Sequence, residues 1–70
     1  MGDESLGTAL PAEMARVRDE VLPEYVKIGQ PGALAVMFIR RDLDAAAQAM
    51  AEGDVVAMLR AYEALRGTSL

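Results

Sequence analysis

The residues of this sequence that could carry out catalysis are carboxylates, hydroxyls, two tyrosines and one lysine, because the chain contains no histidine and no cysteine. The missing histidine removes the usual general base and the commonest metal ligand. Without cysteine there is neither a disulfide nor a thiolate metal site. No set of acid, base and nucleophile can be assembled from this inventory, so we expect a protein that is not an enzyme and has no cofactor.

Two groups of carboxylates are close enough in the sequence to be compared with metal sites. They lie in segments with helical periodicity, and neither sits in a glycine-bearing calcium loop. We therefore expect solvated helix surfaces and no metal. The carboxylates concerned are Asp19, Glu20, Glu24, Asp42 and Asp44. The two tyrosines are typical of the edge of a core, with the hydroxyl group in water.

The composition indicates one small domain with more apolar residues than its size requires. Of 70 residues, 53% are apolar, and the net charge of −4 comes from eleven acidic and seven basic residues spread along the chain. This spread disfavours a nucleic-acid-binding face, which needs concentrated basic residues. The acidic start, MGDESLGTAL, does not resemble a secretory signal, and no stretch approaches the roughly 20 apolar residues of a membrane span. We expect a cytoplasmic protein.

Hydrophobic periodicity predicts an all-α, three-helix domain over residues 11–70, preceded by a flexible tail over residues 1–10. The first helix, about 11–28, starts at Pro11, where a missing N–H costs nothing. Pro23 predicts a kink or a break between residues 19 and 23. The predicted apolar face of this helix comprises Met14, Val17, Val21, Tyr25 and Ile28.

The segment GQPG at 29–32 predicts a turn, followed by a long helix over about 31–52 and a short one over about 55–66, in an antiparallel hairpin. Gly53 is expected to end the long helix in the left-handed conformation, and Asp54 to cap the short one. The predicted apolar faces comprise Ala35, Val36, Ile39, Leu43, Ala46, Ala47 and Met50 on the long helix, and Val55, Met58, Leu59, Tyr62 and Leu65 on the short one.

The long helix opens with seven consecutive apolar residues, 33–39, and they cannot all point toward one core face. The short helix spans only roughly 18 Å and does not reach them, while the first helix covers one side. We therefore predict an interface with another chain. It comprises Leu34, Met37 and Phe38, the minor apolar pair Leu22 and Val26 of the first helix, and the flanking Arg41.

Two interpretations of this apolar run stay open at this point. In one, a kinked first helix wraps the run, and all of these residues belong to the core of a monomer. In the other, which we prefer, the run meets a second copy of the chain, because most soluble oligomers are homo-oligomers and two-fold dimers are the commonest. The second interpretation predicts a homodimer.

The segments LPEY, IG followed by a Gly-Ala apolar run, and AEGDVVAMLRAYEALR resemble short uncharacterised helical proteins encoded in bacteriophage and prophage genomes. The resemblance implies a small acidic protein that binds and modulates a larger host protein in the host cytoplasm. Our hypothesis is thus a homodimeric, non-enzymatic interaction module. The alternative is a small DNA-associated transcriptional regulator, whose duplex binding would weaken steeply with salt.

Overall fold

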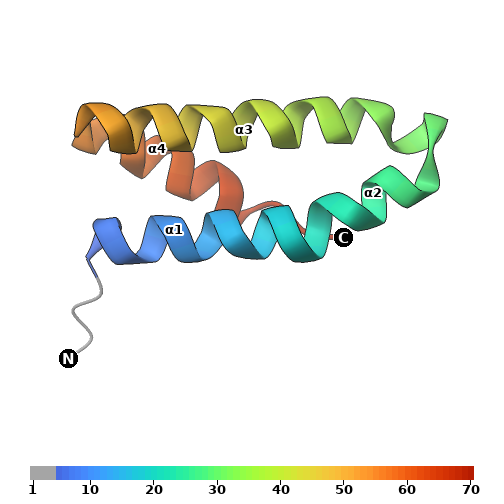
Figure 1. The fold of residues 1–70 in the computed structure, drawn as a ribbon, viewed down its shortest axis with the longest axis horizontal. Coiled ribbons are helices and arrows are strands. Elements are labelled where there is room, and N and C mark those ends of the chain that lie inside the picture. Colours follow the sequence, from blue (N-terminus) through green and yellow to red (C-terminus); the bar gives the residue numbers. More distant parts are fainter. Residues whose placement is uncertain (1–4) are drawn as a thin grey trace.

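The computed structural model describes residues 5–70, and this part of the chain is helical apart from short turns. It contains no strand, which confirms the all-α class, and three helical rods pack together (Figure 1). A π-helical segment, Val17–Val21, joins the first two α-helices, and a 3-10 turn, Gln30–Gly32, precedes the third. The α-helices are α1 (Leu6–Arg16), α2 (Leu22–Ile28), α3 (Ala33–Glu52) and α4 (Val55–Arg66).

The first helix begins at Leu6 and not at Pro11, so the prediction of a tail over residues 1–10 is wrong from Leu6 onward. Residues 1–4 of the predicted tail lie outside the part of the chain that the structure describes. Leu10 is fully buried in the core, and this burial favours extending the helix upstream. Pro11 consequently lies inside α1, where its ring leaves the carbonyl of Gly7 without the usual helical N–H donor.

The backbone stays helical through the region where Pro23 predicts a kink or a break. The N–H of Leu22 donates to the carbonyl oxygen of Val17, five residues earlier, which is the π-helical pattern. Pro23 follows at once as the second residue of α2. A widened turn gives room where the proline ring would crowd the carbonyl of Asp19. In Figure 1, α2 rises from the line of α1 toward the start of α3.

The turn between α2 and α3 depends on two glycines for different reasons. Gly29 has φ 78° and ψ −136°, a backbone conformation that side chains disfavour. Gly32 has an ordinary φ of −92°, but a Cβ atom there would lie 2.4 Å from the carbonyl oxygen of Tyr25. The end of α2 and the start of α3 therefore approach closely because position 32 has no side chain.

The junction between α3 and α4 has the local geometry that the sequence predicts. Gly53 ends α3 in the left-handed conformation, with φ 66° and ψ 26°. Asp54 caps α4, because its Oδ1 accepts a hydrogen bond from the N–H of Ala57 at 3.1 Å. With only two residues between the helices, α4 packs against the C-terminal part of α3 (Figure 1).

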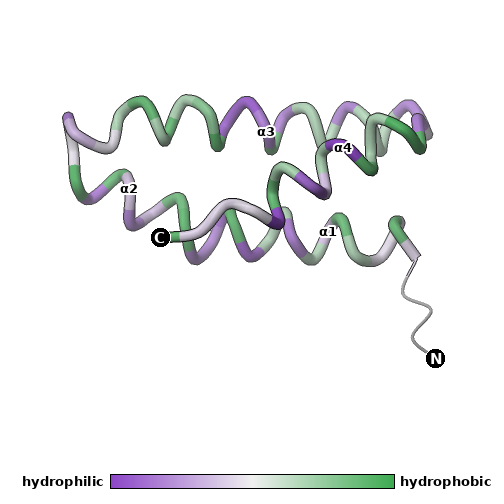
Figure 2. The backbone as a smooth tube through the Cα atoms, turned by 180° about the vertical axis from the view of Figure 1, so that it is seen from behind, coloured by the Kyte–Doolittle hydropathy of each residue, from purple (hydrophilic) through white to green (hydrophobic). Residues whose placement is uncertain are grey.

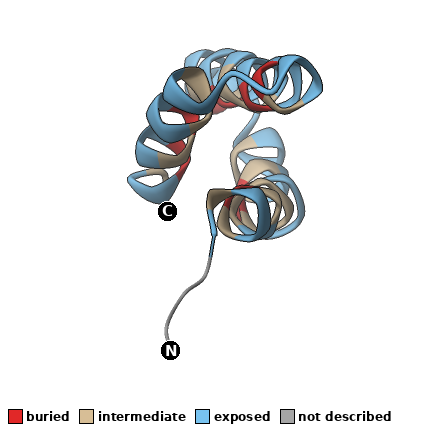
Figure 3. Ribbon diagram, turned by 90° about the vertical axis from the view of Figure 1, so that its left-hand side faces the viewer, coloured by how far each residue is buried: buried red, intermediate tan, exposed pale blue. Residues whose placement is uncertain are grey.

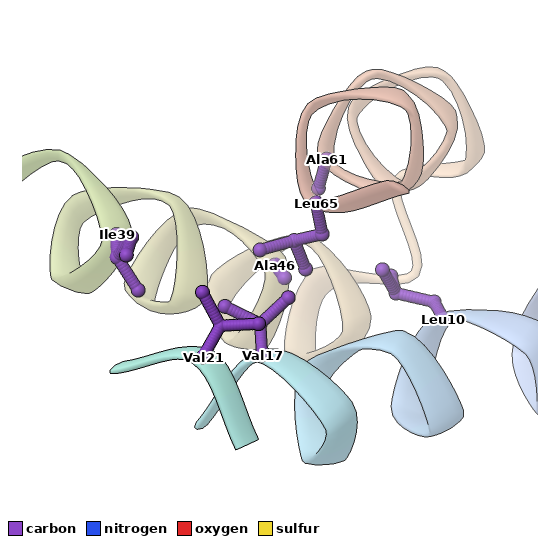
Figure 4. Close-up of a cluster of buried hydrophobic side chains, with 7 residues drawn as sticks. All are labelled: Leu10, Val17, Val21, Ile39, Ala46, Ala61 and Leu65. Atoms are coloured by element: carbon purple, nitrogen blue, oxygen red, sulfur yellow. The ribbon is translucent and has the colours of Figure 1, made fainter. Parts of the chain in front are cut away.

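One small core lies between the three rods. Figure 4 shows its buried side chains, which come from α1 and the π-helical segment on one side and from α3 and α4 on the other. The expected core positions Val17, Val21 and Leu65 are buried there. The cluster comprises Leu10, Val17, Val21, Ile39, Ala46, Ala61 and Leu65.

Several positions on the predicted apolar faces are exposed instead. Ile28 is 53% exposed because it lies at the last residue of α2, beyond the core. Val55 and Leu59 are 66% and 51% exposed, since α4 turns its Ala61 and Leu65 side toward the core. On the predicted apolar face of α3, Ala47 is exposed. Ala49, which is not part of that predicted face, is buried.

Side-chain hydrogen bonds from α1 and α2 hold the end of α4 and the residues that follow it. A guanidinium nitrogen of Arg16, Nη2, donates to the carbonyl oxygens of Leu65 at 2.9 Å and of Thr68 at 3.0 Å. The Tyr25 hydroxyl donates to the carbonyl oxygen of Ser69 at 2.9 Å. Arg16 on α1 and Tyr25 on α2 thus hold the last turn of α4 and the residues that follow it against the first half of the chain.

Candidate interaction surface

The outer face of the first half of α3 is apolar and exposed. Leu34, Met37 and Phe38 are 61%, 67% and 46% exposed. With Arg41 they follow the spacing i, i+3, i+4, i+7, which places all four on one side of the helix. We call these four residues the α3 stripe. Figure 2 shows the hydrophobic start of α3, and Figure 3 shows the exposed outer surface of the helices.

The opposite side of α3 explains why the stripe is uncovered. Ile39 and Ala46, on another side of α3, belong to the core cluster, and the stripe lies outside that cluster. The interpretation in which the first helix encloses the whole apolar run is therefore wrong for the single chain. The structure places Leu34, Met37 and Phe38 on the surface.

The remaining predicted interface residues fall into different environments. Leu22 is half-buried and packs against the core, so it contributes mainly to the fold. Val26, on α2, is 51% exposed. Arg41 lies at the surface with its guanidinium carbon 4.8 Å from the centre of the Phe38 ring, a cation–π contact that shields one face of the ring.

A second exposed apolar group, which the sequence pattern does not predict, lies at the start of α4 and is formed by Val55, Val56 and Leu59. Their exposed fractions are 66%, 61% and 51%. Helical periodicity places Val55 and Leu59 on the predicted core face, because it identifies an apolar side of a helix but not whether another helix lies against that side. The consecutive valines, 55 and 56, were the available signal, since neighbouring positions cannot both face one core.

Next to the α3 stripe, α3 and α4 enclose a surface groove of about 270 Å³. Four of its six lining residues are alanines, whose side chains are small and apolar, so the groove is mainly apolar. A carboxylate from α3 and a guanidinium from α4 complete the lining. The six residues are Asp42, Ala45, Ala57, Arg60, Ala61 and Ala64.

The ion pairs of the described residues join positions that are one or three apart in the sequence. Within residues 5–70, no group of three or more potential metal ligands comes together. The pKa of Asp19 is lowered, chiefly because the exposed neighbouring Arg18 donates a hydrogen bond to its carboxylate. This pair lies on the π-helical segment, and its charges are screened by water.

Two further findings concern the whole chain. No helix in the described part is both long enough and apolar enough to cross a membrane. No family model, no curated protein and no solved structure matches the chain.

Proposed function

We propose that this protein is a non-enzymatic protein–protein interaction module that forms a homodimer through the α3 stripe. The observation that carries the proposal is the exposure of three large apolar side chains, Leu34, Met37 and Phe38, on one side of one helix. Exposed apolar residues that gather on one face typically mark an interaction site, whereas scattered ones need no explanation.

The residue types and the size of the molecule also support a protein partner. Methionine, phenylalanine and arginine are all enriched at the centres of protein interfaces, and the α3 stripe contains each of them. The molecule measures 39 by 25 by 15 Å. A surface of these dimensions can supply the roughly 800 Å² that each partner buries in a standard interface.

Self-association is tested by measuring mass in solution. We expect the wild-type chain of 7.5 kDa to form a particle of twice that mass at micromolar concentration, measured by gel filtration with light scattering. Phe38→Glu should yield monomers, because an unpaired carboxylate is costly to bury in an apolar contact. Val56→Glu is the matched control, since it places the same charge at an exposed apolar site outside the stripe and should leave the dimer intact.

Circular dichroism of each variant separates loss of association from loss of folding. A folded, monomeric Phe38→Glu variant supports the proposal. A wild-type chain that stays monomeric at high micromolar concentration contradicts it. A Phe38→Glu variant with the same particle mass and the same stability as the wild-type chain also contradicts the proposal.

A larger host protein as a second partner follows from the resemblance to phage and prophage proteins and belongs to the same proposal. Such a partner would meet the module in the host cytoplasm. Affinity capture from host lysate with the wild-type chain and with Phe38→Glu tests this step. We expect a protein that the wild-type chain retains and the variant loses, and equal retention by both would contradict a role for the stripe.

A further inference from the structure

The groove between α3 and α4 has two walls of opposite charge. Its lining residues among residues 5–70 come from α3 and α4 alone, so α1 and α2 leave this side of the helical hairpin open. Asp42 lies on the α3 wall and Arg60 on the α4 wall. Within the described part of the chain, no ion pair joins these two side chains. The open face is therefore apolar along its middle, negative on one wall and positive on the other.

Two copies of this face can meet about a two-fold axis in two ways. An axis that runs across the helices lays α3 on the partner's α3 and α4 on the partner's α4, so each charged wall faces its own copy. An axis that runs along the groove lays α3 on the partner's α4. Asp42 then faces the wall that carries the partner's Arg60, and the reverse contact forms by symmetry. Only the axis along the groove brings opposite charges together.

We propose that a second copy of this chain covers the groove, with the two-fold axis along the groove and each α3 packed against the partner's α4. This inference rests on the proposed homodimer and specifies its geometry. The four alanines of the groove allow close approach, because the distance between packed helices depends on the side chains at the contact. Since α3 and α4 are antiparallel within one hairpin, α3 and the partner's α4 are antiparallel too, as in an up-down four-helix bundle.

The symmetry also fixes the register and gives Phe38 a place. A rotation about an axis along the helices shifts no residue along that axis, so each level of one hairpin meets the same level of the other. Phe38 precedes Gly53 by more residues than the 12 that α4 contains, and it therefore lies beyond the end of α4. It also lies one turn from Asp42, on the groove side of α3. The two Phe38 rings, 46% exposed in the single chain, then meet across the axis in the space that both α4 helices leave open.

Reversing the charge of one wall tests this arrangement. Asp42→Arg gives a chain with two positive walls, and Arg60→Glu gives a chain with two negative walls. Each variant alone should weaken the dimer by about tenfold or more, measured by sedimentation over a concentration series. An equimolar mixture of the two variants should form a heterodimer of about wild-type affinity, because every positive wall then faces a negative one. Recovery in the mixture also shows that both variants fold.

Matched controls reverse the same charges outside the groove. Arg40 and Glu20 are exposed and do not line it. Arg40→Glu and Glu20→Arg should each leave the dimer within about threefold of wild type, because exposed charges away from the contact are screened by water.

The outcomes separate this inference from the proposed function. Loss of the dimer in both single variants with recovery in their mixture supports the axis along the groove. If Phe38→Glu gives monomers while Asp42→Arg and Arg60→Glu keep the wild-type affinity, the stripe forms the dimer and the axis along the groove is wrong. Single variants whose mixture does not recover contradict the pairing of opposite walls. A monomeric wild-type chain overturns both the inference and the proposed homodimer.

Discussion

At the scale of single residues, Gly32 allows α2 and α3 to approach closely, because it has no side chain. Its φ of −92° suits any residue, so the requirement for glycine there is one of space and not of backbone conformation. A Cβ atom would lie 2.4 Å from the carbonyl oxygen of Tyr25 and 3.3 Å from its carbonyl carbon. Backbone atoms cannot rotate away as a side chain can, so the turn itself would have to move.

We predict that Gly32→Ala lowers the free energy of unfolding by about 1–3 kcal/mol, the usual cost of overpacking. The control is Gly67→Ala, at a position with φ −81° whose Cβ would have no neighbour nearer than 3.7 Å, and it should be close to neutral. Urea unfolding followed by circular dichroism measures both. Equal stability of the two variants would mean that α2 and α3 are farther apart than described.

At the scale of elements, the sequence predicts a helix boundary correctly where local signals determine it. The prediction is wrong where contacts with distant parts of the chain determine the boundary. Gly53 and Asp54 identify the end of α3 and the start of α4 because the left-handed conformation and the capping carboxylate act within a few residues. The start of α1 depends on the burial of Leu10 against other helices, which outweighs the local signal of Pro11. The π-helical segment likewise cannot be read from Pro23 alone.

Arg16 is the main polar link between elements, and its removal should be costly. We predict that Arg16→Ala lowers the free energy of unfolding by about 1–3 kcal/mol, because the carbonyl oxygens of Leu65 and Thr68 lose a charged donor. Amide hydrogen exchange should also accelerate in the last turn of α4.

Arg18→Ala is the control for Arg16→Ala. Within residues 5–70 its side chain pairs with the adjacent Asp19 at the surface, so the change should stay within about 0.5 kcal/mol. If both variants lose equal stability, the link between α1 and the end of α4 contributes nothing specific.

At the scale of the whole molecule, the thickness of 15 Å explains why the core is small and why the apolar side chains of the α3 stripe are exposed. One helix with its side chains is about 10–12 Å across, so few side chains have neighbours on all sides. The prediction that Leu34, Met37 and Phe38 lack cover came from comparing helix lengths, and their exposure agrees with it. The groove could not be predicted, because it depends on how α4 packs against α3.

Since a dimer buries surface that the single chain exposes, thermal stability should depend on protein concentration. We predict that the melting temperature of the wild-type chain rises by roughly 3 °C or more for each tenfold increase in concentration. Phe38→Glu should show no such dependence. Calorimetry over two decades of concentration measures this, and a constant melting temperature for the wild-type chain would indicate a monomer.

The hydrogen bonds from Arg16 to the carbonyl oxygens of Leu65 and Thr68 join residues 49 and 52 positions apart, whereas only two residues separate α3 from α4. The entropy lost on closing a loop grows with its length, so the hairpin of α3 and α4 closes at lower entropic cost than the contact between α1 and the chain end. In the order of folding, we therefore expect α3 and α4 to pair early and α1 to dock onto them late. The alanine-lined groove would then exist before the core that Leu10 and Val17 complete.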